Sequence, residues 1–443
     1  MFTSYQEVID FLFAQLPMYQ RMGKAAYKAN LNNTIALCNL MGNPEKEIPA
    51  IHVAGTNGKG SVSCMIASAL MEQGYRVGLY TSPHLTDFRE RITINGRKIE
   101  EEAVVDFVNQ YRTQFLPIRP SFFELTFAMA LDFFKKRAVQ IAVFETGMGG
   151  RLDSTNLVQP ILSVITNIGH DHQQFLGDTL TKVAREKAGI IKEGIPVIIG
   201  EKHPESMKVF MEKAEEQHAA ILFAEEHLTI SPAKRLPPDS TTQKNTIRYS
   251  LTSEENTLPL SIQTELMGSY QIQNIRTAIV ALSMLRNTFF PVNGKNIREG
   301  FMHLIKNTHL RGRWQIIETT PLIVCDTGHN KEGIHEVVKM ISQQPYKHLH
   351  LVLGAVNDKD PMDLLGAFPS EATFYFCKPN IPRGQEVERL YEEGKALGIQ
   401  KMQCHKTVSE AYQNAVSQVG EGDMLFVGGS TFVVADLLQF LHK

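Results

Sequence analysis

The sequence predicts an α/β fold: a P-loop domain on a mostly parallel sheet with a small β excursion, followed by a second Rossmann-like α/β domain. Three observations support this fold class. A glycine-rich turn at 55–61 joins a short apolar run to a helical pattern. Apolar runs alternate with helical patterns through most of the chain, which is typical of parallel sheets covered by helices. The length of 443 residues and the hydrophobic fraction of 43% suffice for more than one packed core.

The strands expected in the first domain are short, rich in β-branched or aromatic residues, and bounded by turns. They lie at 48–54, 77–80, 139–144, 161–165 and 196–199. Beyond residue 219 the pattern changes to strand-like runs with polar joins, at 220–223, 246–251 and 260–266. We interpret these runs as a small, partly antiparallel excursion, which a strong helical pattern at 270–285 follows.

The alternation of strands and helices starts again in the last third of the chain. Strands are expected at 322–325, 349–353, 373–377 and 424–427. The preceding segment, 307–313, lacks clear periodicity. We therefore expect one domain at 1–306 and another at 307–443.

Composition excludes several classes of protein. Lys plus Arg total 45 against 47 for Asp plus Glu, and no basic stripe indicates a nucleic-acid partner. No apolar run reaches the about 18 residues that a membrane helix needs. The first ten residues lack the cationic start and apolar centre of a signal peptide, and five scattered cysteines suit a reducing compartment. We expect a cytoplasmic monomer that binds neither nucleic acid nor membranes.

The turn at 55–61 has the context of a phosphate-binding P-loop. It runs Gly55-Thr56-Asn57-Gly58-Lys59-Gly60-Ser61. Glycines let backbone N–H groups approach an anion, the start of the helix adds a favourable dipole, and Lys59 adds a positive charge. The alternative is a glycine-rich turn with a surface lysine. The loop is unusual because Gly60 separates Lys59 from the hydroxyl of Ser61.

Two acidic or imidazole-containing segments are candidates for metal binding. Glu145 ends an expected buried strand, so its charge needs a partner, and Mg²⁺ prefers carboxylate and phosphate oxygens. A solvated glutamate at a strand end is the alternative. His170-Asp171-His172 follows another strand, but the sequence offers no further ligands at the spacing of a zinc site.

Lys187 lies on the apolar face of a helix expected at 179–191, with Asp178 as its N-cap. An inward lysine is costly unless it is neutral or paired. A lysine that extends along the edge of the apolar stripe toward water is the common alternative.

Taken in order along the chain, these motifs resemble the folylpolyglutamate synthase and dihydrofolate synthase family, within the Mur ligase superfamily. The resemblance rests on the P-loop, Thr81-Ser82-Pro83-His84-Leu85, Glu145-Thr146-Gly147-Met148-Gly149-Gly150-Arg151-Leu152-Asp153, His170-Asp171-His172, Glu186-Lys187-Ala188-Gly189, Asn274, Arg313 and Asp326-Thr327-Gly328-His329-Asn330. Gly328 departs from the alanine usual in the last motif.

The resemblance implies an ATP-dependent amide ligase of folate biosynthesis. The γ-phosphate of ATP would pass to a carboxylate, and the amine of L-glutamate would attack the resulting acyl phosphate. The implied carboxylate substrate is dihydropteroate, a reduced folyl-(poly)glutamate, or both. The cofactors implied are ATP and two Mg²⁺ ions, which with Lys59 and Arg313 would offset the anionic charge.

The resemblance also assigns roles to individual residues. Nucleotide binding falls to Gly55, Thr56, Asn57, Gly58, Lys59, Gly60, Ser61, Asn274, Arg313 and Asp326. Metal binding falls to Ser61, Ser82, Glu145, His172 and a carbamylated Lys187. Substrate contacts fall to Ser82, Phe123, Asp153, His329 and Ser430. The catalytic set is Lys59, Lys187, Asp326 and His329.

Two other functions remain as alternatives. A wall-building Mur ligase carries a uridine-nucleotide domain before its P-loop, but only about fifty residues precede this one, where a domain needs about 100. A nucleotide-binding switch without chemistry would not need Glu145, His172 and Lys187 together, nor the pair Asp326 and His329.

Overall fold

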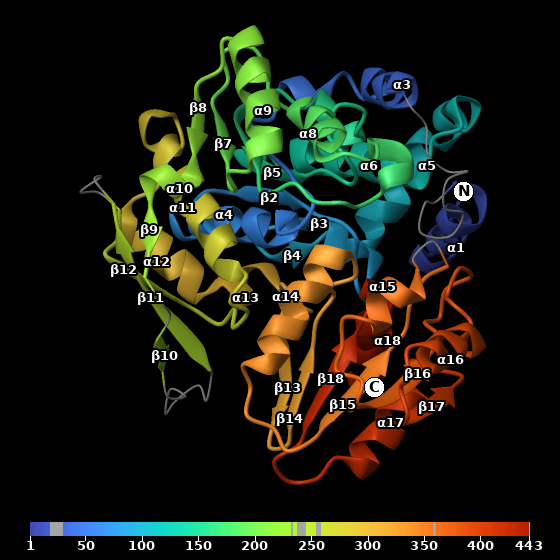
Figure 1. Cartoon of the computed structure of the whole chain (residues 1–443). Helices are drawn as coiled ribbons and strands as arrows, with labels where there is room; N and C mark the ends of the chain where they lie inside the picture. Colours follow the sequence, from blue (N-terminus) through green and yellow to red (C-terminus); the bar gives the residue numbers. More distant parts are fainter. Residues whose placement is uncertain (18–29, 232–233, 237–244, 254–257, 358–359, 443) are drawn as a thin grey trace. The chain divides into compact units, whose positions relative to one another are not determined.

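The computed structural model of the chain describes residues 1–17, 30–231, 234–236, 245–253, 258–357 and 360–442, which form two compact units (Figure 1). The first comprises 1–84, 89–265 and 270–310, and the second comprises 85–88, 266–269 and 311–443. The fold class predicted from the sequence is confirmed.

The first unit is built on an eight-stranded sheet with the order β4-β3-β2-β5-β1-β6-β7-β8. The strands are β1 (Ala50–Ala54), β2 (Val77–Tyr80), β3 (Ile92–Ile94), β4 (Arg97–Lys98), β5 (Ile141–Glu145), β6 (Pro160–Ile165), β7 (Val197–Ile199) and β8 (Ile221–Phe223). All neighbours pair in parallel except β2–β3 and β3–β4. The strands expected from apolar runs are present, with ends shifted by at most two residues. The short, partly polar β3 and β4 were not anticipated.

Helices surround this sheet. They are α1 (Tyr5–Gln15), α3 (Asn32–Leu40), α4 (Lys59–Glu72), α5 (Glu101–Phe115), α6 (Phe122–Lys136), α7 (Gln173–Leu176), α8 (Leu180–Ala188), α9 (Pro204–Glu216), α10 (Ala224–His227), α11 (Gln271–Met284), α12 (Gly294–Met302) and α13 (Leu304–Thr308). Helix α4 is buried along residues 61–70 because it contacts β1, β2 and β5 as well as α11, α12 and α13. Among the described helices, none is long and apolar enough to cross a bilayer.

The β excursion forms a separate four-stranded sheet. It contains β9 (Thr229–Ile230), β10 (Lys234–Leu236), β11 (Thr246–Thr252) and β12 (Ser261–Thr264), which pair in antiparallel fashion. Burial alternates along most of β11, so one face of this sheet packs inward. The expected excursion was too long at one end, because β8 pairs in parallel with β7 and belongs to the main sheet.

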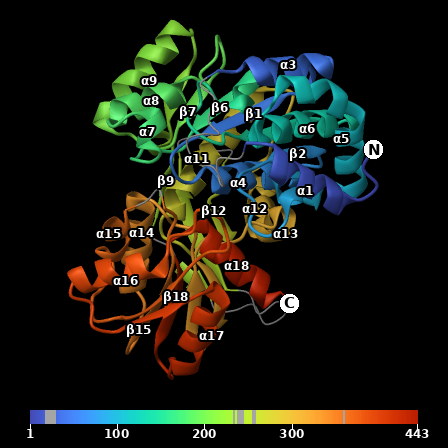
Figure 2. The same cartoon turned by 90° about the vertical axis from the view of Figure 1, so that its right-hand side faces the viewer.

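The second unit is a six-stranded sheet with helices on both faces (Figure 2). Its strands are β13 (Gln315–Thr319), β14 (Leu322–Cys325), β15 (Leu349–Leu353), β16 (Thr373–Cys377), β17 (Met402–His405) and β18 (Met424–Gly428), in the order β13-β14-β18-β15-β16-β17. Only the β13–β14 pair is antiparallel among these strands. The helices are α14 (Lys331–Ser342), α15 (Pro361–Leu365), α16 (Val387–Ala396), α17 (Val408–Gln418) and α18 (Thr431–Leu441).

The helix that carries Lys187 differs from its expected limits. Thr179, rather than Asp178, is the N-cap of α8, because the Thr179 side chain accepts a hydrogen bond from the backbone N–H of Lys182. Asp178 instead forms an exposed ion pair with Lys182 Nζ at 2.8 Å. The helix ends at Ala188, and Gly189 follows where a Cβ atom would lie 2.4 Å from Arg151 Cα.

The close approach of α12 to α4 depends on Gly300. A Cβ atom there would lie 2.6 Å from the Cα of Ala69, and Ser68 Oγ donates to the Gly300 carbonyl at 2.7 Å. Gly300→Ala should therefore lower the free energy of unfolding by about 1–3 kcal/mol, since the helices must separate. Urea unfolding measures this change, with the exposed Lys295→Ala on the same helix as the control. Equal stability of the two variants would contradict the prediction.

Candidate active site

The glycine-rich turn connects the central strand β1 to α4. Gly58 is the N-cap of α4 with φ of 81°, a conformation that favours glycine, and Lys59 is the first helical residue. Lys59 Nζ donates to the carbonyls of Gly55 at 3.0 Å and Thr56 at 3.2 Å. The turn thus has a P-loop arrangement in which the lysine amine stays next to the loop backbone.

The segment after β6 holds this loop in shape. The backbone N–H groups of Thr56 and Asn57 donate to the backbone oxygen and the Oδ1 of Asn167, at 3.0 and 2.8 Å. Thr166 Oγ1 donates to the Asn57 carbonyl at 2.6 Å, and the Gly169 N–H donates to Thr56 Oγ1 at 2.9 Å. Sequence reasoning missed these supporting residues, although their position directly after an expected strand was a usable signal.

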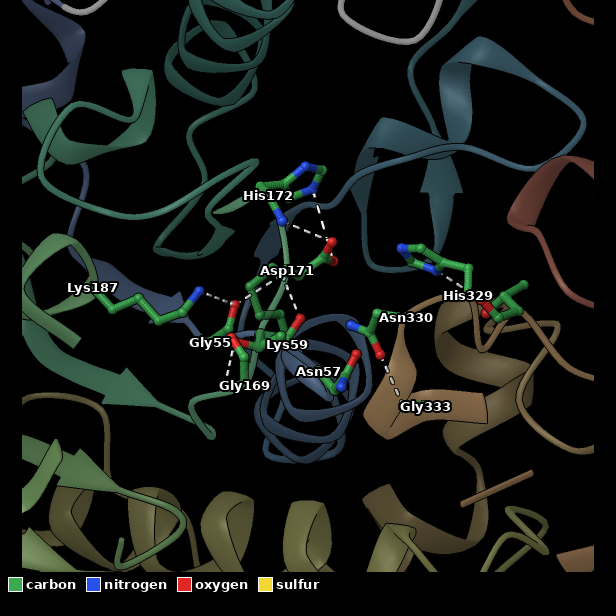
Figure 3. Close-up of polar contacts among 12 residues, drawn as sticks. Gly55, Asn57, Lys59, Gly169, Asp171, His172, Lys187, His329, Asn330 and Gly333 are labelled. Atoms are coloured by element: carbon green, nitrogen blue, oxygen red, sulfur yellow. Dashed lines mark hydrogen bonds and ion pairs between the residues drawn. The ribbon is translucent and has the colours of Figure 1, made fainter. Parts of the chain in front are cut away.

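Lys187 is 2% exposed, and its Nζ donates to the Gly55 carbonyl at 2.8 Å (Figure 3). Two lysine amines therefore share one acceptor. Burial, and then the like charge of Lys59, hold the pKa of Lys187 well below its usual value, while Asp171 and Asp153 oppose this shift. The inward orientation predicted from the helical pattern is confirmed, since Lys187 is among the buried residues of α8.

Side-chain oxygen atoms that could bind a metal ion lie beside the P-loop. Glu145 ends β5 with 4% exposure, and its strand neighbour in β1 is Val53, two residues before Gly55. Its Oε2 accepts from the backbone N–H of Ser82 at 3.0 Å. Ser61 is buried in the first turn of α4. A carboxylate and hydroxyls around a phosphate loop are donors that suit Mg²⁺, so these residues fit that ion.

His172 and Asp171 lie next to the same loop (Figure 3). His172 is the N-cap of the short helix α7, and its Nε2 is 3.9 Å from Asp171 Oδ2. Asp171 was not among the expected site residues, yet it is 8% exposed and acts electrostatically on Lys187. In the described ranges, no group of three or more His, Cys, Asp or Glu is placed to hold a metal. The expected metal-binding set instead includes serines and a lysine.

Asp153 and Phe123 both contact the loop after β5. The Oδ2 of Asp153 accepts from the backbone N–H of Met148 at 2.9 Å. The ring of Phe123 covers Gly147, where a Cβ atom would lie 2.6 Å from Phe123 Cζ. These two candidate substrate residues therefore contact Gly147 and Met148, which lie two and three residues after Glu145.

Asn274, in the first turn of α11, also reaches the P-loop. A Cβ atom on Gly58 would lie 2.1 Å from Asn274 Oδ1, and Asn274 Nδ2 donates to Gln271 Oε1 at 2.8 Å. Gln271 in turn donates to Ser61 Oγ at 3.3 Å. Asn274 is thus placed in the first unit beside the loop.

The remaining candidates lie in the second unit, where β14 and β18 end side by side. Asp326 is 3% exposed, and its two carboxylate oxygens accept from the backbone N–H groups of Trp314 at 2.6 Å and Gly328 at 2.8 Å. Arg313 donates to the hydroxyl of Thr327. The carboxylate therefore fixes the backbone directly after Arg313 and the loop that leads to α14.

His329 and Ser430 belong to the two loops at this edge. His329 Nδ1 is 3.0 Å from the carbonyl of Thr327. Ser430 is buried as the N-cap of α18 and accepts from the Phe432 N–H at 3.2 Å. Parallel strand ends that meet in this way form the usual ligand-binding edge of an α/β sheet.

Gly328 occupies a tight position in the loop. A Cβ atom there would lie 3.1 Å from the carbonyl oxygen of Gly333. An alanine would therefore need the first turn of α14 to shift slightly, which accounts physically for a glycine in this chain.

Comparisons with known proteins agree with this geometry. Residues 53–282 match the Mur ligase middle domain, and 312–431 match the Mur ligase, glutamate ligase domain. The dihydrofolate synthase/folylpolyglutamate synthase of Bacillus subtilis is 32% identical over 451 residues, covering 100% of both chains. That of Escherichia coli is 29% identical and covers 88% of this chain and 86% of its own.

Solved structures show the same similarity. E. coli FolC in complex with DHPP and ADP superposes with a TM-score of 0.82 at 27% identity, covering 99% of this chain and 98% of that one. The folylpolyglutamate synthase of Thermotoga maritima gives a TM-score of 0.80 at 30% identity, covering 99% and 97%. The chain is an ATP-dependent ligase, and it belongs to the folylpolyglutamate synthase and dihydrofolate synthase family of the Mur ligase superfamily.

Proposed function

We propose that this enzyme ligates L-glutamate to dihydropteroate and to folyl-(poly)glutamates through an acyl phosphate. The observation that carries the proposal is the P-loop of β1 and α4, which has a second, buried lysine on the carbonyl of Gly55. The names of the B. subtilis and E. coli relatives include both activities, which supports a bifunctional enzyme.

The P-loop binds the phosphates of ATP through backbone N–H groups and Lys59. Lys59 stays close as the γ-phosphate moves to the substrate carboxylate, so it offsets charge that grows on the transferred oxygens. Asn274 and Arg313 hold the nucleotide, and Asp326 keeps Arg313 in place through the adjacent N–H of Trp314. His329 and Ser430 hold the glutamate whose amine attacks the acyl phosphate.

Two Mg²⁺ ions would be held by Ser61, Ser82, Glu145, His172 and a carbamylated Lys187. When bound, they neutralise phosphate charge and polarise the bond that breaks. Lys187 would reach this state because burial lowers the pKa of its amine, and the neutral form of the amine can attack carbon dioxide. The nitrogen lone pair forms a bond to the carbon, one C=O electron pair moves to an oxygen, and a proton leaves the nitrogen for water. An anionic carbamate thus replaces the neutral amine beside Lys59.

Phe123 and Asp153 bind the pterin ring. The Phe123 ring lies against Gly147 and offers a stacking surface, and the Asp153 carboxylate accepts hydrogen bonds from ring N–H groups. We propose that the enzyme works on these small molecules as a cytoplasmic monomer, with the domains at 1–306 and 307–443.

The activity itself is tested by ADP release. With ATP, Mg²⁺ and L-glutamate present, ADP should form when dihydropteroate is added, and also when tetrahydrofolate is added. If no ADP forms with dihydropteroate or with tetrahydrofolate, the proposed ligase reaction is overturned. Formation with one alone would overturn the bifunctional part.

Lys59→Ala should lower turnover by about two orders of magnitude or more, because a key electrostatic group is lost from the phosphate site. Steady-state ADP release measures this loss, and circular dichroism checks that the variant is folded. The control is Lys208→Ala, which changes a lysine with an 81% exposed side chain. Near-normal turnover of Lys59→Ala would contradict the P-loop assignment.

Gly55→Ala should weaken ATP binding by more than about tenfold, because overpacking at a fixed backbone distorts its surroundings. A Cβ atom at Gly55 would lie 1.8 Å from Thr166 Oγ1, and its φ of 152° disfavours a side chain. Calorimetric titration with ATP measures the affinity. Gly42→Ala is the matched control, since its φ is also positive but no atom lies within 4 Å. Similar affinities of both variants would argue against a rigid loop.

Lys187→Ala should be nearly inactive, and short carboxylic acids such as formate should partly restore turnover by replacing the carbamate. With ¹³C-bicarbonate, the native enzyme should show a carbamate signal in the NMR spectrum that Lys187→Ala lacks. Lys182→Ala, an exposed change on the same helix, serves as the control. An unmodified Lys187 in a crystal grown with bicarbonate, Mg²⁺ and nucleotide would refute carbamylation.

A further inference from the structure

A buried histidine lies in the strand that leads to the P-loop. His52 is 0% exposed in the middle of β1, between Phe144 of β5 and Ser163 of β6. Its Nε2 lies 2.8 Å from Thr155 Oγ1. The function proposed above gives this side chain no role, although a buried imidazole in a central strand is costly to keep.

Thr155 connects the imidazole to Asp153. Thr155 is 0% exposed, and its hydroxyl donates to Asp153 Oδ1 at 2.5 Å. The backbone N–H of Thr155 donates to the same oxygen at 3.0 Å, while the Oδ2 accepts from the Met148 N–H at 2.9 Å. Thr155 thus holds one oxygen of the Asp153 carboxylate, and the loop after β5 holds the other.

The direction of these bonds follows from counting protons. An ionised carboxylate only accepts, so the one hydroxyl proton of Thr155 goes to Asp153. The Thr155 oxygen must then accept from His52, which places a proton on Nε2. The Nδ1 of His52 carries none and has no hydrogen-bond partner among the residues that the structure describes.

His52 is suited to remain a neutral donor. Burial lowers the pKa of His52 to about 3, and the charge of Lys192 adds to this effect. The imidazole therefore keeps its single donor role across the pH range in which the enzyme works. A lysine in its place would bring a buried charge, and an aliphatic residue would leave the Thr155 oxygen without its donor.

This donor chain acts on a carboxylate that burial destabilises. Burial raises the pKa of Asp153, and the hydrogen bonds from Thr155 and from the backbone of Met148 counteract it. Each donor thus favours the ionised form and fixes the plane of the carboxylate. Both properties matter for an acceptor of ring N–H groups, because these bonds are directional.

We propose that His52 is a positioning residue for the pterin substrate, acting through Thr155 on Asp153. The inference rests on the proposed role of Asp153 in binding that ring. The hydrogen-bond chain from His52 to Asp153 would help select the pterin ring. It begins in β1, the strand that leads into the P-loop, so one strand supports both the nucleotide loop and the pterin acceptor.

The test compares substitutions that remove a donor with ones that keep it. His52→Leu and Thr155→Val remove the imidazole N–H and the hydroxyl, and His52→Gln and Thr155→Ser retain them. Removal should raise KM for dihydropteroate about tenfold, as the loss of a bond to a charged group does, and leave KM for ATP within about twofold. The two conservative variants should recover most of the affinity.

A double-mutant cycle asks whether His52 acts through Asp153. The equilibrium Kd for dihydropteroate, followed by pterin fluorescence, is measured for Asp153→Asn, His52→Leu and the double variant. The double variant should bind no more weakly than Asp153→Asn alone. Thermal unfolding and KM for ATP identify a variant that is merely misfolded. If His52→Leu is misfolded, Thr155→Val takes its place in the cycle with Asp153→Asn.

The outcomes separate this inference from the proposed function. Wild-type enzyme that neither binds dihydropteroate nor releases ADP with it overturns both. Unchanged affinity of Asp153→Asn overturns the pterin role of Asp153 and the inference that rests on it. Weak binding by Asp153→Asn with normal binding by His52→Leu and Thr155→Val, or additive losses in the cycle, overturns the His52 inference alone.

Discussion

One backbone oxygen, the carbonyl of Gly55, accepts from the amines of both Lys59 and Lys187, and the chemistry of the site depends on this shared acceptor. Two ammonium groups on one carbonyl repel each other, and the more buried one bears the larger cost of desolvation. Lys187 therefore favours its neutral form. A neutral amine beside a phosphate loop is open to chemistry with carbon dioxide that a solvated lysine would resist.

The same loop needs rigidity, because backbone N–H groups stabilise phosphate only if they already point toward it. Here the rigidity comes from the segment after β6, in which Thr166, Asn167 and Gly169 hydrogen bond with Thr56 and Asn57. Helix α4 adds a second support, since residues 61–70 are buried on all sides. The phosphate site is thus held in place both by the segment after β6 and by the buried helix α4.

Several residues with expected chemical roles also carry structural hydrogen bonds. Asp326 accepts from the N–H groups of Trp314 and Gly328, Glu145 accepts from Ser82, and Asp153 accepts from Thr155 and Met148. Each carboxylate therefore orders the loop that surrounds it. Charge in these sites is placed where neighbouring N–H groups already compensate part of it, which lowers the cost of burial.

The sequence by itself determined the elements whose signals are local. Apolar runs with β-branched residues predicted the parallel strands, and the spacing of 55–61 and the helical stripe predicted the P-loop and the buried Lys187. The strands β3, β4 and β17, which are only two to four residues long, were not predicted because tertiary pairing, rather than local pattern, makes them strands. Only the tertiary structure decided that Lys187 and Lys59 share Gly55, that Asp171 lies near them, and that His52 reaches Asp153 through Thr155. The contacts of Lys187 with Gly55 and of His52 with Thr155 join residues that are 132 and 103 positions apart. A linear pattern carries no information about which distant side chains the sheet order brings together.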